Sequence, residues 1–180
     1  MNDREIHLPD GPPRAAALVL HPHPAMGGDR HHPLVVAIAE GLAARGIAAL
    51  RVDLTDPDPV AAAEVAAIIA DELLAGLDCR ELFLAGYSWG SLVSALVVDD
   101  RVARRVLVAP PVSMLVPPMG VETPTLVLVP GHDQYGPPDA VRHAFGGGRN
   151  AQIEVVEGTD HFLGGAVQRI ADRAVGFLAD

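Results

Sequence analysis

The chain has 180 residues, a formal net charge of −10 and a sequence pI near 5.1. This length suits one domain over residues 1–180, and the acidic balance disfavours nucleic acid and anionic membranes as partners because both repel a negative surface. All 13 basic residues are Arg, which excludes catalysis through a lysine amine, as in a Schiff base or a phosphate-binding loop.

Short apolar runs rich in Val, Leu and Ile alternate along the chain with longer segments of helical period. The runs predict strands over 4–8, 15–20, 47–52, 82–86, 105–109, 125–130 and 152–156. Helices are predicted over 33–45, 59–76, 89–99, 138–145 and 165–178, the first closed by Gly46 and the second by Gly76. This alternation predicts an α/β fold with a mostly parallel sheet of about seven strands and helices on both faces, in which ligands bind at the carboxyl ends of the strands.

A serine stands at one of these strand ends. The strand over 82–86 runs into GYSWG, residues 86–90, and a helical segment follows at once. A G-x-S-x-G sequence between a strand and a helix is typical of a nucleophile elbow, in which Gly86 and Gly90 leave room for a sharp turn that raises the serine. The helix that begins behind Ser88 favours negative charge at its amino terminus. Ser88 is therefore the predicted nucleophile.

A serine hydroxyl needs a base, and the base needs an acid that orients it. Two later strand ends supply both, because Asp133 lies in the loop GHDQYG after one strand and His161 lies in EGTDHFLGG after the next. The order Ser88, Asp133, His161 is the one expected for such a triad. The strand before Asp133 ends in Ala-Pro-Pro without a carboxylate, and Asp160 adjoins His161 too closely in sequence to reach its far ring nitrogen.

The loop HPHPAMGG, residues 21–28, is the predicted second wall of an oxyanion hole. One backbone N–H should come from Trp89, which follows the nucleophile, and the other from this loop. Its two prolines have no N–H to donate. His23 is the first candidate, with Ala25 or Met26 as alternatives.

Four histidines, His21, His23, His31 and His32, gather in the same region and raise the question of a metal site. Only Asp29 accompanies them, without a cysteine or a second carboxylate at ligand spacing, so we expect no metal and no cofactor. His21, at the end of a strand, fits a buried hydrogen-bonding histidine, and it is also a candidate to contact substrate.

These motifs resemble the α/β-hydrolase superfamily, and within it the compact, lid-free bacterial hydrolases whose oxyanion loop begins His-Pro-His-Pro and continues through Gly-Gly. Dienelactone hydrolase-like enzymes are similar, though more distantly. The resemblance runs from Leu18 to Phe162 through HPHPAMGG, GYSWG, GHD and DHF. It implies an esterase-like hydrolysis of a small acyl compound with Ser88, Asp133 and His161 as triad.

Two segments bear on the substrate. Relatives usually carry an Arg-Gly-x-Gly-x-Ser loop after the strand that ends in RVD, whereas this chain has LTDPDPV, with acidic residues that would disfavour anionic substrates if they faced the site. Residues 110–124, rich in proline, are too few for a lid domain. We expect an open, shallow site bordered by Met114, Leu115 and Met119, with Met26 as a further substrate contact.

Location and partners are expectations of a simpler kind. Cys79 is the only cysteine, which excludes an internal disulfide and fits a reducing compartment. The amino terminus lacks an apolar stretch of signal-peptide length, and no run approaches the roughly 18 apolar residues that cross a bilayer. We expect a cytoplasmic protein that acts on a small molecule; its oligomeric state is open, and a non-catalytic binding protein, a peptidase or an acyltransferase stay alternatives to an esterase.

Overall fold

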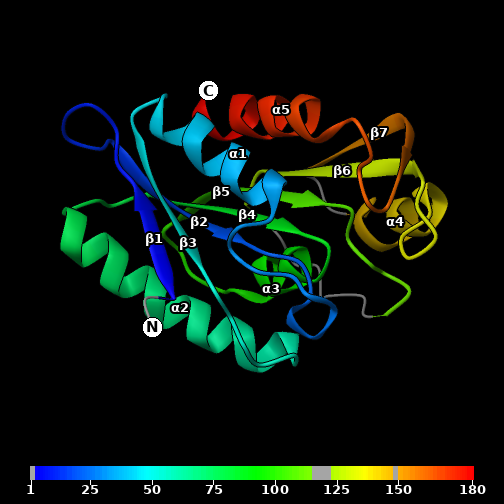
Figure 1. Cartoon of the computed structure of the whole chain (residues 1–180), viewed down its shortest axis with the longest axis horizontal. Coiled ribbons are helices and arrows are strands. Elements are labelled where there is room, and N and C mark those ends of the chain that lie inside the picture. The colour runs from blue at the N-terminus through cyan, green and yellow to red at the C-terminus, as the bar shows by residue number, and fades with distance from the viewer. Residues whose placement is uncertain (1–2, 115–122, 148–149) are drawn as a thin grey trace.

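A seven-stranded sheet organises the computed structural model, which describes residues 3–114, 123–147 and 150–180 (Figure 1). Its strands lie in the order β1-β3-β2-β4-β5-β6-β7, with β1 antiparallel to β3 and every other pair of neighbours parallel. The strands are β1 (Arg4–His7), β2 (Ala15–Leu20), β3 (Ile47–Val52), β4 (Leu82–Tyr87), β5 (Val102–Val108), β6 (Thr125–His132) and β7 (Ala151–Asp160). The predicted, mostly parallel sheet of about seven strands is confirmed.

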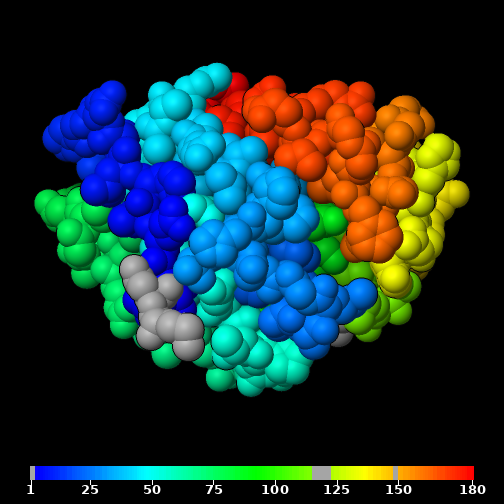
Figure 2. Space-filling view, in the orientation of Figure 1, coloured from blue at the N-terminus to red at the C-terminus, as the bar shows by residue number. Residues whose placement is uncertain are grey.

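Helices cover both faces of this sheet, as predicted. They are η1 (Pro24–Met26), α1 (Pro33–Ala43), α2 (Pro59–Leu77), α3 (Trp89–Leu96), α4 (Pro138–Phe145) and α5 (Val167–Ala179). α1 and α5 pack side by side on one face, where Figure 2 shows them in light blue and in orange to red. α2, α3 and α4 pack on the other face. Consecutive strand residues serve opposite faces, which is why the buried strands are apolar throughout.

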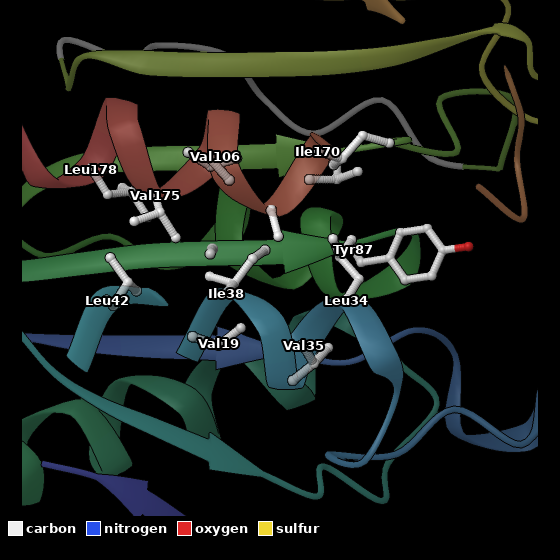
Figure 3. Close-up of a cluster of buried hydrophobic side chains, with 14 of the residues drawn as sticks. Val19, Leu34, Val35, Ile38, Leu42, Tyr87, Val106, Ile170, Val175 and Leu178 are labelled. Atoms are coloured by element: carbon white, nitrogen blue, oxygen red, sulfur yellow. The ribbon is translucent and has the colours of Figure 1, made fainter. Parts of the chain in front are cut away.

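The alternation is visible in β2. Ala15, Ala17 and Val19 belong to the cluster under α1 and α5, whereas Leu18 and Leu20 belong to the cluster over α2 and α3. Figure 3 shows the first cluster, in which side chains of α1 and α5 meet those of the central strands. The two apolar layers hold the central strands rigidly, so their carboxyl ends form a fixed platform.

Several boundaries differ from the sequence prediction. α3 ends at Leu96 instead of residue 99, and β7 spans Ala151–Asp160 instead of 152–156. β5 begins at Val102 instead of residue 105, because Arg104 also fits the sheet and donates to the Phe177 carbonyl oxygen. α2 passes through Gly76 and ends with Asp78 in the left-handed conformation, at φ 54°. α1 stops at Ala43, and Gly46, at φ 79°, turns the chain into β3.

Because the central strands are parallel, their carboxyl ends meet at one edge of the sheet. His21 follows β2, Ser88 follows β4, Asp133 follows β6 and His161 follows β7. The topology thus brings residues that are far apart in the sequence to the same edge.

Candidate active site

The turn between β4 and α3 is the sharp elbow that the sequence predicts. Ser88 has φ 53° and ψ −120°, a conformation that costs a non-glycine residue on the order of 1–3 kcal/mol. A Cβ on Gly86 would lie 2.1 Å from the carbonyl oxygen of Gly90, and one on Gly90 would lie 2.4 Å from the carbonyl oxygen of His21. Both positions therefore require glycine, because the helix leaves the strand at this close approach.

Ser88, His161 and Asp133 form a continuous hydrogen-bonded chain. The Ser88 Oγ lies 2.8 Å from the His161 Nε2, and the His161 Nδ1 lies 2.8 Å from the Asp133 Oδ2. All three side chains are buried. An ionised carboxylate only accepts hydrogen bonds, so the proton of a neutral His161 sits on Nδ1 and leaves the Nε2 lone pair facing the serine hydroxyl.

Backbone amides fix the second oxygen of Asp133. The Oδ1 accepts hydrogen bonds from the amides of Tyr135 at 2.8 Å and Gly136 at 3.0 Å. Because Oδ1 is engaged in this way, the carboxylate cannot rotate freely and presents Oδ2 to the imidazole. A Cβ on Gly136 would lie 2.2 Å from the Pro110 carbonyl oxygen, so the loop after β6 is packed closely against the loop after β5.

Two tyrosines that were not predicted from the sequence contact His161, one at its backbone and one at its ring. The Tyr87 hydroxyl donates a hydrogen bond of 2.7 Å to the carbonyl oxygen of His161, and Figure 3 shows this side chain reaching out of the hydrophobic cluster. Burial raises the pKa of Tyr87 well above its usual range, so this hydroxyl stays protonated. The Tyr135 ring meets the imidazole edge-on at 4.7 Å between centroids. The only signal was Tyr87's place beside Ser88.

Residues 22–28 leave one backbone N–H for an oxyanion. Ala25 N–H donates to the Nδ1 of His23, and the amides of Met26 and Gly28 donate to its carbonyl oxygen. Gly27 N–H donates to Pro24, and the two prolines have no N–H. Within residues 22–28 of the described chain, His23 is thus the residue whose amide has no such engagement. Trp89 stands at the first position of α3, where amides lack helical partners.

The structure does not bring His21 to the pocket. Its side chain is 1% exposed, with the Nδ1 2.6 Å from the Pro22 carbonyl oxygen and the Nε2 accepting from Leu54 N–H at 2.9 Å. These partners fix the neutral ring with its proton on Nδ1, and burial lowers the pKa of His21. The ring stacks on Trp89 at 5.6 Å. Of its two predicted roles, the buried hydrogen-bonding histidine fits this geometry and the substrate contact does not.

A cavity of about 200 Å³ opens beside Ser88. Met26 and Met114 line it as predicted, while Leu115 and Met119 lie outside the described residues. Several of the other lining residues were not predicted from the sequence: Pro22, His32, Tyr87, Leu92, Pro111, Tyr135 and Phe162. Among the residues that the structure describes, no Asp, Glu or Arg lines the cavity.

The acidic turn after β3 is engaged elsewhere. Asp53 accepts from the backbone amide of Arg30 and pairs with its guanidinium, and Asp58 caps α2. The Trp89 Nε1 donates a 2.9 Å hydrogen bond to the Pro57 carbonyl oxygen. The turn therefore supports the elbow from behind, and its carboxylates do not line the cavity.

Within residues 3–114, 123–147 and 150–180, no cluster of three or more His, Cys, Asp or Glu side chains could hold a metal ion. Nor does this part of the chain contain a helix with the length and apolar character needed to cross a membrane.

Comparisons with known proteins find likeness in structure. No protein-family model and no curated protein matches the sequence. An α/β serine hydrolase homologue from Coxiella burnetii has 22% identity and a TM-score of 0.86, over 96% of this chain and 89% of that chain. A lid-less α/β serine hydrolase from Xanthomonas campestris has 22% identity and a TM-score of 0.84, over 97% of this chain and 87% of that chain. Est1E from Butyrivibrio proteoclasticus has 14% identity and a TM-score of 0.83, over 97% of this chain and 92% of that chain.

With its strand order and the short 109–124 connection between β5 and β6, this chain has the fold of the α/β-hydrolase superfamily in its lid-free form.

Proposed function

We propose that the chain is a serine hydrolase that cleaves a small, uncharged ester, thioester or lactone through an acyl-enzyme intermediate. The observation that carries the proposal is the 2.8 Å separation between the Ser88 Oγ and the His161 Nε2, in a chain that continues to Asp133. A non-catalytic protein has no need for a strained serine held against a correctly protonated imidazole.

The geometry supports the following reaction. His161 takes the Ser88 proton on Nε2 as the serine oxygen attacks the carbonyl carbon, and the resulting imidazolium is stabilised by Asp133. The oxyanion forms hydrogen bonds with the amides of Trp89 and His23. His161 then gives the proton to the leaving group, and the acyl group stays on Ser88. Water, activated by the same imidazole, releases the acid and restores the serine.

Exposed apolar side chains around the cavity mouth support an uncharged substrate. Met26 is 73% exposed, Met114 63% and Phe162 63%, and all three line the cavity. Large apolar side chains grouped at an opening are characteristic of sites that bind apolar groups. The described lining contains no Arg side chain that could act as a counter-ion to an anionic substrate.

A fluorophosphonate probe tests the nucleophile directly. We expect one phosphonate adduct, located on Ser88 by peptide mass spectrometry, and hydrolysis of a 4-nitrophenyl ester that the adduct abolishes. Ser88→Ala should lower kcat by at least about a thousandfold while the melting temperature stays near or above that of the parent, because the strained serine is not needed for folding. Unlabelled Ser88 together with turnover that survives in the variant would reject the proposal.

A panel of acceptors separates the alternatives that share this site. Ester cleavage with no cleavage of aminoacyl amides is the expected pattern. Faster cleavage of the amides would identify a peptidase, and transfer to added alcohols in preference to water would identify an acyltransferase.

A further inference from the structure

Among the described residues, part of the polar wall of the cavity is already engaged. The Tyr87 hydroxyl donates to the His161 carbonyl oxygen and the Trp89 Nε1 to the Pro57 carbonyl oxygen, whereas the Tyr135 hydroxyl has no hydrogen-bond partner within the described residues. His32 also lines the cavity and lies between the loop over 21–28 and α1. Its ring meets the Tyr87 ring at 4.8 Å between centroids.

One nitrogen of His32 is committed to the helix behind it. His32 is the N-cap of α1, and its Nδ1 accepts the amide proton of Leu34 at 3.3 Å. Pro33, at the first helical position, has no N–H, so Leu34 supplies the first amide that needs a cap. A nitrogen that accepts a hydrogen bond carries no proton, and the neutral ring must therefore hold its proton on Nε2.

The other nitrogen is an available donor. Within the described residues the Nε2 of His32 has no hydrogen-bond partner, and it is absent from the atoms that are fully buried without one. The nitrogen is thus reached by solvent in a half-buried side chain that lines the cavity. Burial lowers the pKa of His32, which keeps the ring neutral and the Nε2–H in place near neutral pH.

We propose that the Nε2–H of His32 is a specificity-determining donor that binds a second, uncharged oxygen of the substrate, such as an ether, carbonyl or hydroxyl oxygen on an otherwise apolar chain. The inference rests on the proposed function and names its substrate class more narrowly. A fixed donor in an apolar wall discriminates because a methylene in place of the oxygen leaves the N–H without a partner.

His32→Asn isolates the donor from the cap. Asparagine is a preferred N-cap residue and can accept the Leu34 amide proton, but its short side chain ends before the position of Nε2. His31→Asn is the matched control, since His31 is exposed and does not line the cavity. Both variants should melt near the temperature of the parent, whereas His32→Ala should melt lower because it loses the cap.

Matched ester pairs then read out the donor. Butanoate and methoxyacetate esters of 4-nitrophenol differ by one methylene against one oxygen, as do pentanoate and 3-methoxypropanoate. A second arm places the oxygen in the alcohol, with butyl and 2-methoxyethyl benzoates. Because each parent-to-variant ratio uses a single substrate, the intrinsic reactivity of the ester cancels.

The expected result is a loss of about fivefold in kcat/KM for His32→Asn with an oxygen-bearing ester in one arm, against less than twofold for its methylene partner and for His31→Asn. Equal changes for oxygen and methylene esters in both arms would overturn the donor role. Failure of the proposed function looks different, because then no ester in either arm is hydrolysed by the parent in a manner that depends on Ser88.

Discussion

At the scale of single residues, the site depends on histidines whose two nitrogens are assigned to different tasks. His161 faces a carboxylate through Nδ1 and the serine through Nε2. His21 faces a carbonyl oxygen through Nδ1 and an amide through Nε2. His21 is thus the same tautomer as His161, but both its partners are backbone groups, so it holds loops together where His161 can move a proton.

His21 should make stability depend on pH. Its pKa is lowered in the folded chain by burial, with Asp53 and Asp29 opposing the shift, so the unfolded chain binds more protons below about pH 6.5. The free energy of unfolding should therefore fall as the pH drops below that value, by no more than about 1.4 kcal/mol per pH unit for this one group. His21→Gln, which keeps an acceptor for Leu54, should flatten the slope between pH 7 and 5 in urea denaturation.

The slope of the free energy of unfolding against pH tests this prediction. The absolute free energy does not, because the substitution can also lower stability at every pH. His31→Asn, at an exposed neighbouring position, should leave the slope unchanged. A slope that persists in full in His21→Gln would show that another group accounts for the pH dependence.

Whether a site residue could be predicted from the sequence depends on what places it in the site. Ser88, Asp133 and His161 stand directly after strands, so chain order and strand ends were enough to predict that they meet. Tyr87, Tyr135 and His32 reach the cavity through contacts whose partners only the folded chain defines. His21 shows what the sequence does not predict. Its ring accepts a hydrogen bond from the Leu54 amide instead of lining the cavity, and nothing in the local sequence pattern indicates this contact.

At the scale of elements, the sequence alone does not show which residue ends a helix. Gly76 was predicted to end α2, yet the helix continues to Leu77 and Asp78 adopts the left-handed conformation. A glycine late in a helical pattern commonly marks the end of a helix. Here Asp78 makes the turn, and its backbone N–H donates a hydrogen bond to the Leu74 carbonyl oxygen. The strand β5 was predicted to begin at residue 105 but begins at Val102, and Arg104 in the added part donates to the Phe177 carbonyl oxygen.

Paired substitutions at Gly90 and Gly76 should therefore have opposite effects. Gly90→Ala places a Cβ 2.4 Å from the His21 carbonyl oxygen and should lower the free energy of unfolding by about 2 kcal/mol or more, with loss of activity. Gly76→Ala meets no atom within 4 Å in an exposed helical position and should raise it by roughly 0.5–1 kcal/mol. Chemical denaturation measures both, and a neutral Gly90→Ala would contradict the close approach of α3 to β2.

The loop between β3 and α2 is tied to the elbow by two ring nitrogens. Leu54 donates to His21 and Pro57 accepts from Trp89, while the two rings stack on each other. The segment that departs from the Arg-Gly-x-Gly-x-Ser pattern of similar hydrolases thus acts here through its backbone. Its acidic side chains serve Arg30 and the cap of α2.

At the scale of the whole molecule, the net charge of −10 surrounds a cavity whose described lining contains no Arg. An anionic substrate is then repelled during its approach and finds no counter-ion after it arrives. A neutral substrate experiences neither effect and gains the apolar contacts of the rim. The overall charge and the cavity lining therefore select in the same direction.

The 4-nitrophenyl monoester of glutaric acid and its neutral methyl ester test this selection. The neutral compound should have a kcat/KM at least about tenfold higher at low salt, because a protein's field changes encounter rates by that order. Raising the ionic strength to about 0.5 M should reduce the difference in kcat/KM between the two esters, because salt screens the long-range repulsion of the anionic ester. The kcat/KM of the neutral ester should change little and serves as the control. A residual gap at high salt measures the missing counter-ion in the cavity. Equal rates for the two esters at low salt would contradict this selection, since they would require a compensating cation near Ser88, and no Arg is among the described lining residues.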